Sequence, residues 1–545
     1  MLTPEYLEDL PGSIVDLYRQ AEDAILADMA RRISNMDLFS PTADWQYRKL
    51  REAGALSDDI LEELSRLTHK TKTELKKLMQ EAANVSLGYD ESVYEGVGIT
   101  GEPLSSSEPL RRILNAGYAK TAQTMRNLTG TTARTASQQF ERALDQAWMK
   151  VNTGGFSTDQ AVRDAVQELS ARGVESITYR KDGEVTRTDT LEVATRRAVV
   201  TGVNQTCGEL QLERAKEMGA DLMELTAHEG ARPSHAEWQG QIVSLSGQPG
   251  YLSLDDIGYG DVTGFKGANC RHDWNPWFEG MPRTWTPEAL AKLNEKRYEY
   301  NGKKLTQYEA SQIQRANERE IRRWKREYKA MEAAGQDTSE AAAKISYWNK
   351  RQDDFLQQTG FKRQQSRGEI AGFTWKDQKA ASEQATDRYN EWAKSIGVKN
   401  SIEDLAKYYD IKYNDSPRYE LLQKYVSSVK AGKLSPLAGF DLYEQYHARI
   451  ESGLVGIEVG GTTITGQTDH FLERVFGCMR DPKNGKPRDG TALEDVFDCI
   501  KNPIKIMPPV TKENGDVSFV VIGHRAMVSI DPYSGGLIQT NRWRG

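Results

Sequence analysis

The sequence has no long uninterrupted apolar run and little cysteine. None of its segments approaches the roughly 18 consecutive apolar residues that span a bilayer, so no membrane-spanning segment is expected. The opening residues MLTPEYLEDLPG have neither a basic start nor an apolar segment, and no secretory signal peptide is expected. Cys207, Cys270, Cys478 and Cys499 are too few and too far apart to staple 545 residues, which favours reduced thiols in a cytoplasm.

Neither basic nor acidic residues dominate the chain, but the two kinds are unevenly distributed along it. The net charge is -7, yet residues 1–282 carry 30 basic and 43 acidic side chains, whereas residues 283–395 carry 23 and 17. The second stretch is therefore a basic segment beside an acidic one. An acidic neighbour or DNA is an expected contact for it.

The chain is too long for one hydrophobic core. At about 100 to 200 residues per domain, 545 residues indicate about three to five structural units. Apolar residues make up 38% and charged residues 28%, which supplies cores but leaves much of the surface to long, solvated helices.

Helical periodicity dominates the first part of the chain. Apolar residues recur at helical spacing over 14–36 and 56–83, and a third helical block from about 110 to 151 is rich in Ala, Thr and Gln. A helix from Ser157 to about Gly173 precedes two alternating runs joined by Lys181-Asp182-Gly183, which predicts a β-hairpin.

The later part of the chain changes texture twice. Residues 222–282 are irregular and rich in loops, whereas 287–395 return to helix with a narrow apolar stripe from Ile313 to Met331, as for a partner helix. After Gly453, short β-prone runs alternate with helices near 470–476 and 493–499, and strands are expected at 517–522 and 526–530.

These patterns predict a mainly α protein with α+β elements, built from several domains: long helices, a loop-rich central domain and a small C-terminal α+β domain. We divide it into an N-terminal helical region (1–155), a core with the hairpin and the loop-rich segment (156–282), a basic helical arm (283–395), a helical connector (396–454) and an α+β module (455–545) that is expected to fold alone.

Four possible metal ligands lie on two stretches of the loop-rich segment, about 35 residues apart. His228 and His235 have H-x6-H spacing, and Cys270 and His272 have C-x-H spacing. Imidazole and thiolate are ligands that Zn²⁺ prefers, and four of them would form a closed, structural zinc site. The alternative is that these histidines, with Arg232 and Arg271, only hydrogen-bond loop carbonyls.

The central motifs resemble a known family. HEGARPSHAEWQGQIVSL, LDDIGYGDVTGFKGANCRHDWNPWFEG, the YRKDGEV hairpin, TRRAVVTGVNQ and QRANEREIRRWKREYKA occur in order over about residues 1–390. They resemble phage minor capsid proteins of the head-morphogenesis type. Related sequences often carry paired cysteines before a short His and Cys cluster, and this chain departs from them because it has no C-x2-C pair.

The resemblance implies a few-copy component of the virion, in the capsid interior or at the portal vertex, that is assembled in the host cytoplasm. Its partners would be the phage portal and major capsid proteins, and packaged DNA would contact the basic arm. The seven basic residues between Arg315 and Lys329 could neutralise several phosphates. Because Glu318, Glu320 and Glu327 are interleaved with them, a solvated helix face with i to i+4 pairs is favoured over a DNA surface.

A second resemblance covers about residues 460–545. HFLERVFGCMRD, LEDVFDCIKNPIKI and VSFVVIGHRAMVSIDPYSGGLIQTN are similar to phage-associated modules of the barnase, EndoU, colicin and RelE nuclease superfamily. This implies a metal-independent ribonuclease acting on RNA, which needs a base, an acid and a cation for the phosphate. The roles expected are His470 as base, Arg474 as phosphate clamp, His524 as acid, and Ser529 or Thr540 orienting the phosphate.

Other interpretations stay open for the C-terminal module. His524 could merely cap the turn at Gly523, and Arg474 could pair with Asp469 or Glu473 on the surface. The whole protein would then be purely structural or scaffolding, with a module that binds without catalysis. A toxin of another chemistry, such as ADP-ribosyl transfer, is disfavoured because no glutamate follows Glu513.

Overall fold

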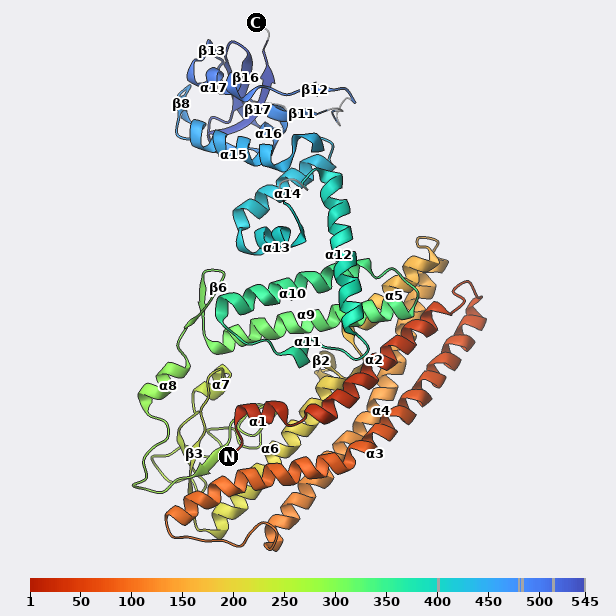
Figure 1. Cartoon of the computed structure of the whole chain (residues 1–545), viewed down its shortest axis with the longest axis vertical. Coiled ribbons are helices and arrows are strands. Elements are labelled where there is room, and N and C mark those ends of the chain that lie inside the picture. Colours follow the sequence, from red (N-terminus) through yellow and green to blue (C-terminus); the bar gives the residue numbers. More distant parts are fainter. Residues whose placement is uncertain (399–401, 479–480, 482–484, 512–514, 544–545) are drawn as a thin grey trace. The chain divides into compact units, whose positions relative to one another are not determined.

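Two long antiparallel helices form the frame of the N-terminal part of the protein (Figure 1). They are α3 (Thr42–Gly96) and α4 (Glu108–Asn152), and α2 (Gly12–Ser34) and α6 (Leu191–Glu217) pack along them. One apolar stripe on each helix meets those of the others in a single continuous core. The computed structural model describes residues 1–398, 402–478, 481, 485–511 and 515–543.

The chain forms two compact units, Met1–Ser382 and Glu383–Gly545. The prediction of a mainly α protein with α+β elements is confirmed, since long helices dominate the first unit and small sheets with short helices occupy the end of the second. In the described parts of both units, no helix has the length and the apolar composition that a membrane crossing requires.

Small residues let α4 and α6 approach closely. Gly117 of α4 faces Thr206 of α6, and Gly202 of α6 faces Thr121 of α4. A Cβ atom at Gly117 would lie 2.1 Å from the Thr206 Oγ1 atom, and one at Gly202 would lie 2.2 Å from the Thr121 Oγ1 atom. Because of this reciprocal pairing, a larger side chain at either glycine would force the helices or the facing threonine to shift.

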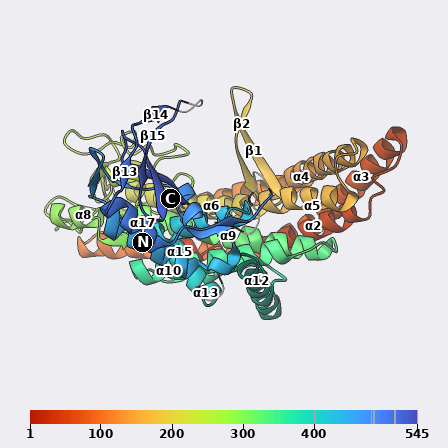
Figure 2. The same ribbon diagram turned by 90° about the horizontal axis from the view of Figure 1, so that it is seen from above.

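The predicted hairpin is present, and Figure 2 shows it rising from the helices. Strands β1 (Glu175–Lys181) and β2 (Glu184–Thr190) pair antiparallel around Asp182 and Gly183, both with positive φ. The preceding helix α5 (Thr158–Arg172) begins where the Ser157 side chain accepts the N–H of Gln160.

The loop-rich segment is organised around a small sheet in the order β4-β3-β5. These strands are β3 (Leu222–Leu225), β4 (Ile242–Ser244) and β5 (Trp274–Pro276), with the one-turn helix α7 (Pro233–Ala236) between β3 and β4. Buried Trp238, Phe265 and Trp274 pack together in the core of this segment.

The basic segment folds back on its own unit. Its main helix α9 (Gln307–Ala333) starts with a Thr306/Glu309 capping box and packs against α10 (Ser339–Thr359), α5 and α2. The apolar stripe of α9 is thus covered within the chain. The shorter elements of this segment are α8 (Pro287–Leu293), β6 (Tyr298–Tyr300), β7 (Lys303–Leu305) and α11 (Gln365–Gly368).

The second unit begins within α12 (Trp375–Ile396) and has one shared core. The sheet runs β10-β17-β16-β15-β13, and β10 pairs parallel with β17. After α12, the elements of the second unit are α13 (Leu405–Asn414), α14 (Ser416–Lys430), η1 (Pro436–Ala438), α15 (Phe440–Leu454), β8 (Glu458–Val459), β9 (Thr462–Thr463), β10 (Gly466–Gln467), α16 (Asp469–Phe476), β11 (Gly477–Cys478), β12 (Arg488–Asp489), α17 (Leu493–Lys501), β13 (Lys505–Ile506), β14 (Val510–Thr511), β15 (Val517–Ile522), β16 (Ala526–Ile530) and β17 (Gly536–Arg542).

The connector and the α+β module share one hydrophobic core. Tyr425, Phe440 and Tyr443 of the connector belong to the same buried cluster as Phe471 and Val528 of the module. The boundary predicted near residue 455 therefore runs through a continuous hydrophobic core.

Candidate metal centre and C-terminal site

The sheet of the loop-rich segment brings the predicted ligands together. Leu225 of β3 lies opposite Trp274 of β5, and the Thr226 N–H donates to the Asp273 carbonyl (2.8 Å). Since the strands are antiparallel, the residues that follow β3 and those that precede β5 leave the sheet side by side. His228 and His272 are such residues, and their ring centroids lie 4.4 Å apart.

His235, Cys270 and His272 form a buried group. Their ligand atoms all lie within 4.8 Å of one another, and each residue is at most 2% exposed. The Nδ1 atoms of His235 and His272 are 3.3 Å apart, and the Cys270 Sγ atom lies 3.9 and 3.8 Å from them. The fourth predicted ligand, His228, packs with a tilted ring against His272 but is not a member of this group.

Burial controls the protonation of these groups. Desolvation lowers the pKa of His235 to about 4 and that of His272 well below its usual value, and it raises the pKa of the Cys270 thiol. Without a metal, the group therefore holds two neutral imidazoles and a thiol at neutral pH.

Two side chains of this segment also contact loop carbonyls, as the alternative interpretation expects. The His235 Nε2 atom lies 2.9 Å from the Thr263 carbonyl oxygen, and the Arg232 guanidinium donates to the Ala268 carbonyl (3.2 Å). Arg271, in contrast, pairs with the Glu8 carboxylate of α1 (Pro4–Asp9). These contacts leave the facing Nδ1 atoms of His235 and His272 available.

In the C-terminal module, His470 and Arg474 meet as their spacing predicts. The Arg474 Nε atom is 3.4 Å from the His470 Nε2 atom, and the His470 Nδ1 atom is 3.1 Å from a carboxylate oxygen of Glu473. Glu473 is buried, and the Ser428 hydroxyl donates to it (2.9 Å). Desolvation raises the pKa of Glu473, but the hydrogen bonds from His470 and Ser428 and the nearby Lys433 ammonium together lower it below its usual value. Asp469 pairs instead with Lys424.

Among the described residues, His524 and Thr540 make their hydrogen bonds to groups other than His470 and Arg474. His524 lies in the turn between β15 and β16, where its Nδ1 atom is 3.3 Å from the Asp498 carboxylate. Ser529 pairs with Gln539, and the adjacent Val528 pairs with Thr540, so Ser529 and Thr540 lie on opposite faces of the sheet. The Thr540 hydroxyl donates to the Met527 carbonyl (3.0 Å).

Sequence reasoning did not find a cleft lined by eight arginines. It has a volume of about 320 Å³ and lies between α1, α2, α6, α9, α11 and the loop before β5. The spacing of Arg315, Arg319 and Arg322 places them on one face of α9, which is the signal that could have indicated it. The charged residues of the lining are Arg19, Arg196, Arg197, Arg271, Arg315, Arg319, Arg322, Arg367, Glu8, Glu192 and Glu318.

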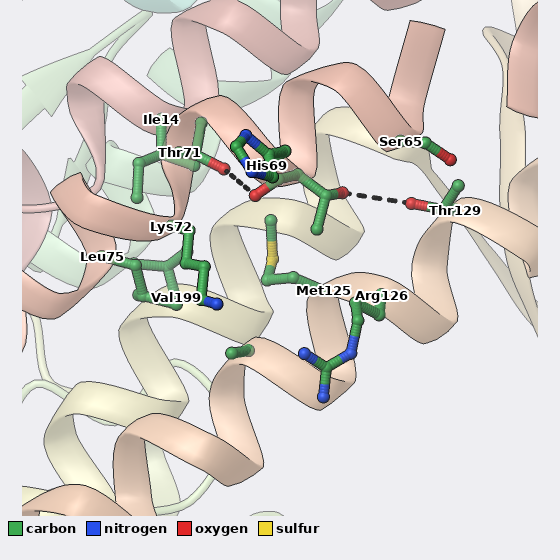
Figure 3. A pocket seen from close by; sticks show the side chains of 12 residues that line it. Ile14, Ser65, His69, Thr71, Lys72, Leu75, Met125, Arg126, Thr129 and Val199 are labelled. Carbon is green, nitrogen blue, oxygen red and sulfur yellow. Dashed lines mark hydrogen bonds between the residues drawn. The ribbon is translucent and has the colours of Figure 1, made fainter. Parts of the chain in front are cut away.

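A second pocket, of about 430 Å³, lies among the helices of the frame (Figure 3). Its wall includes His69 and Lys72 of α3 and Arg126 of α4. The Thr68 and Thr129 hydroxyls, 3.2 Å apart, join α3 to α4 there. These contacts hold the two helices together, and no arrangement of acid, base and nucleophile accompanies them in the described part of the pocket.

Comparisons with known proteins point to one class, the structural proteins of bacteriophage particles. A structural protein of Lactococcus phage LL-H is 22% identical over 306 residues, which cover 54% of this chain and 78% of that protein. A structural protein of Lactococcus phage mv4 is 31% identical over 93 residues, which cover 17% of this chain and 68% of that protein.

The sequence pattern of the family described as phage minor capsid protein 2 matches residues 2–357. The chain therefore belongs to the phage minor capsid protein 2 family and is a structural protein of the virion. The match takes in the helical frame, the group of His235, Cys270 and His272, and most of the arginine cleft. No solved structure matches the chain. The resemblance of the C-terminal module to nucleases stays a prediction.

Proposed function

We propose that the protein works at the portal vertex of the phage head, in head assembly or in DNA packaging and ejection, and that its arginine cleft contacts the packaged DNA. The observation that carries the DNA contact is the excess of positive charge in that cleft, on arginines that are mostly half-buried. The portal and major capsid proteins are the neighbours expected at this place.

The carboxylates of the cleft are shared among several arginines. Glu8 pairs with Arg196, Arg271 and Arg367. Glu192 is similarly shared between Arg19 and Arg322. The cleft therefore contains more guanidinium groups than its own carboxylates neutralise.

Within the described residues, no carboxylate lies within ion-pair distance (4.0 Å) of Arg315 or Arg319. Burial, and then repulsion from Arg315 and Arg367, lowers the pKa of Arg271 to about 9. A phosphate entering the cleft would remove this repulsion and accept paired N–H donors from the guanidinium groups.

DNA binding tests this role directly. We expect the double variant Arg315→Ala/Arg319→Ala to bind duplex DNA more weakly than the wild type, by roughly tenfold or more at low salt. The slope of log affinity against log salt should fall by about 1 for each phosphate that the variant no longer neutralises. The matched control is Arg111→Ala/Arg112→Ala, which removes two exposed arginines at the start of α4. Equal affinity and equal slope for all three proteins would contradict the contact.

An asymmetric reconstruction of purified heads tests the location. Density for the protein is expected at the single portal vertex, at low copy. Density repeated over the whole capsid lattice would contradict the location but not the DNA contact.

We also propose the C-terminal module as a ribonuclease, because Glu473 orients His470. In this arrangement His470 Nδ1–H donates to Glu473, and Nε2 becomes the base that removes the 2'-hydroxyl proton. Arg474 lies beside it to hold the phosphate, with His524 as the expected acid. The alternative is a purely structural protein whose module binds without cutting.

The full chain, incubated with RNA in the presence of a chelator, should cleave it to a cyclic phosphate. His470→Ala should reduce the rate by about 10² to 10⁴, as for the loss of a general base. His69→Ala, which removes an exposed histidine of the other unit, is the control. Absence of cleavage by the folded wild type, with host extract also tested, would favour the binding module.

A further inference from the structure

We propose that His235, Cys270, His272 and His228 bind one zinc ion, which locks the loop-rich segment of residues 222–282. This inference is independent of the arginine cleft and of the C-terminal module. Three observations support the ion: the interatomic distances, the tautomers that neighbouring atoms impose, and the buried His228 Nε2 atom, which has no hydrogen-bond partner among the described residues.

The distances match those of a tetrahedral site. With Zn–N of about 2.0–2.1 Å and Zn–S of about 2.3 Å, two nitrogen ligands lie about 3.3 Å apart and a nitrogen and a sulfur about 3.6 Å apart. The corresponding separations are 3.3 Å between the two Nδ1 atoms, and 3.9 and 3.8 Å from the Cys270 Sγ atom to them. One ion can therefore touch all three atoms with little movement of the side chains.

The neighbours of the two rings determine where their protons are. The His235 Nε2 atom faces the Thr263 carbonyl oxygen (2.9 Å), which can only accept, so this nitrogen carries the proton. The His272 Nε2 atom faces the Gln239 Oε1 atom (3.3 Å). That atom also accepts the His228 backbone N–H (3.1 Å), which identifies it as the oxygen, and His272 Nε2 is a donor too.

Both Nδ1 atoms consequently present lone pairs to each other. Two neutral imidazoles in these tautomers cannot hydrogen-bond through Nδ1, and the single Cys270 thiol proton can satisfy only one of them. A divalent cation bound to the thiolate satisfies all three atoms at once.

His228 supplies the fourth ligand. Its Nδ1 atom lies 2.9 Å from the Glu229 carbonyl oxygen and therefore carries the proton, which leaves a lone pair on Nε2. That Nε2 atom is buried and has no hydrogen-bond partner among the described residues. The His228 ring packs against the His272 ring, with centroids 4.4 Å apart, so a four-ligand site requires only that this side chain rotate until Nε2 occupies the fourth position of the tetrahedron.

Such a site has a structural role. Four protein ligands leave no open position for water, and Trp238 packs against both His235 and His272. The His235 and His272 protons donated to Thr263 and Gln239 are the kind of outer contacts that orient zinc-bound imidazoles. The ion would join α7, the loop after β3 and the loop before β5.

The test is the metal content and the spectrum of the full-length protein. We expect about one zinc per chain by elemental analysis after purification without added metal. Replacement of zinc by Co²⁺ should give the intense visible bands of a tetrahedral site and a thiolate-to-cobalt charge-transfer band in the near ultraviolet. His228→Ala should retain the charge-transfer band but alter the visible bands, since water would replace one nitrogen.

Cys270→Ser should abolish the charge-transfer band and lower the zinc content at least tenfold. Cys499→Ser is the matched control, because it removes another buried thiol and should change neither measurement. If Cys270→Ser does not fold, the wild-type cobalt spectrum still decides the question. Wild-type protein that contains no zinc and gives no charge-transfer band with Co²⁺ would overturn the proposal.

Discussion

The loop-rich segment of the first unit and the α+β module of the second both contain residues that the sequence marks as a site, and they differ in how those residues meet. In the loop-rich segment, irregular chain on either side of a strand pair brings His235, Cys270 and His272 into contact. In the module, the regular alternation of β16 and β17 sends Ser529 and Thr540 to opposite faces. Loops can converge on a point, whereas neighbouring strand residues diverge.

The largest expected effect is that metal removal changes the thermal stability of one region and not that of the other. A strong zinc chelator should lower the melting temperature of the first unit and leave that of the second unchanged, because a structural zinc contributes on the order of 10 kcal/mol to folding. Differential scanning calorimetry of the full chain, followed by re-addition of zinc, measures both transitions. If the chelator changes neither melting temperature, the two regions do not differ in their dependence on metal.

A smaller effect, but one of several kcal/mol, concerns the shared core of the second unit. We expect residues 383–545 to unfold cooperatively as an isolated fragment and residues 455–545 to be much less stable. The shorter fragment lacks Tyr425, Phe440 and Tyr443, and loss of a buried aromatic ring costs about 3–5 kcal/mol. Denaturant titration followed by circular dichroism compares them. Equal stability would support the boundary predicted at residue 455.

A substitution at the crossing of α4 and α6 should have an effect of about 1–3 kcal/mol. Gly117→Ala should destabilise the first unit, because the added carbon would lie 2.1 Å from the Thr206 hydroxyl oxygen. Gly130→Ala is the matched control on the same helix, where a Cβ atom meets nothing within 4 Å. It should be neutral or stabilising by up to about 1 kcal/mol, and the same sign for both variants would contradict close packing at this crossing.

A further effect is a pH dependence of stability within the first unit. Burial, and then the nearby Glu22 carboxylate, raises the pKa of Asp23 to about 7. The folded state therefore binds this proton more tightly than the unfolded state, and the stability it contributes is lost as the pH rises from about 4 through 7. Asp23→Asn should raise the melting temperature more at pH 8 than at pH 5.

The amide at position 23 can still accept the Ala371 N–H, which donates to the Asp23 carboxylate over 2.6 Å. Asp58→Asn, at an exposed site on α3, is the control and should show no such difference between the two pH values. A melting temperature of Asp23→Asn that rises equally at both pH values would contradict a raised pKa.

Local patterns in the sequence determined most of the secondary structure. Asp182-Gly183 predicted the turn between β1 and β2, Ser157 predicted the start of α5, and alternating residues predicted β15 and β16. Each of these depends on interactions between residues close in sequence, such as a cap, a turn conformation or the two faces of a strand. The spacing of His470 and Arg474 likewise suffices to bring them together on one helix.

Tertiary structure alone decided how distant segments combine. The four predicted metal ligands could be named from their chemistry, but only the pairing of β3 with β5 brings the stretch after Leu225 beside the stretch before Trp274. The basic residues of α9 could be counted, but their place in a cleft depends on α1, α6 and α11 folding against them. Periodicity reports which face of a helix is apolar, and it carries no information about which distant segment covers that face.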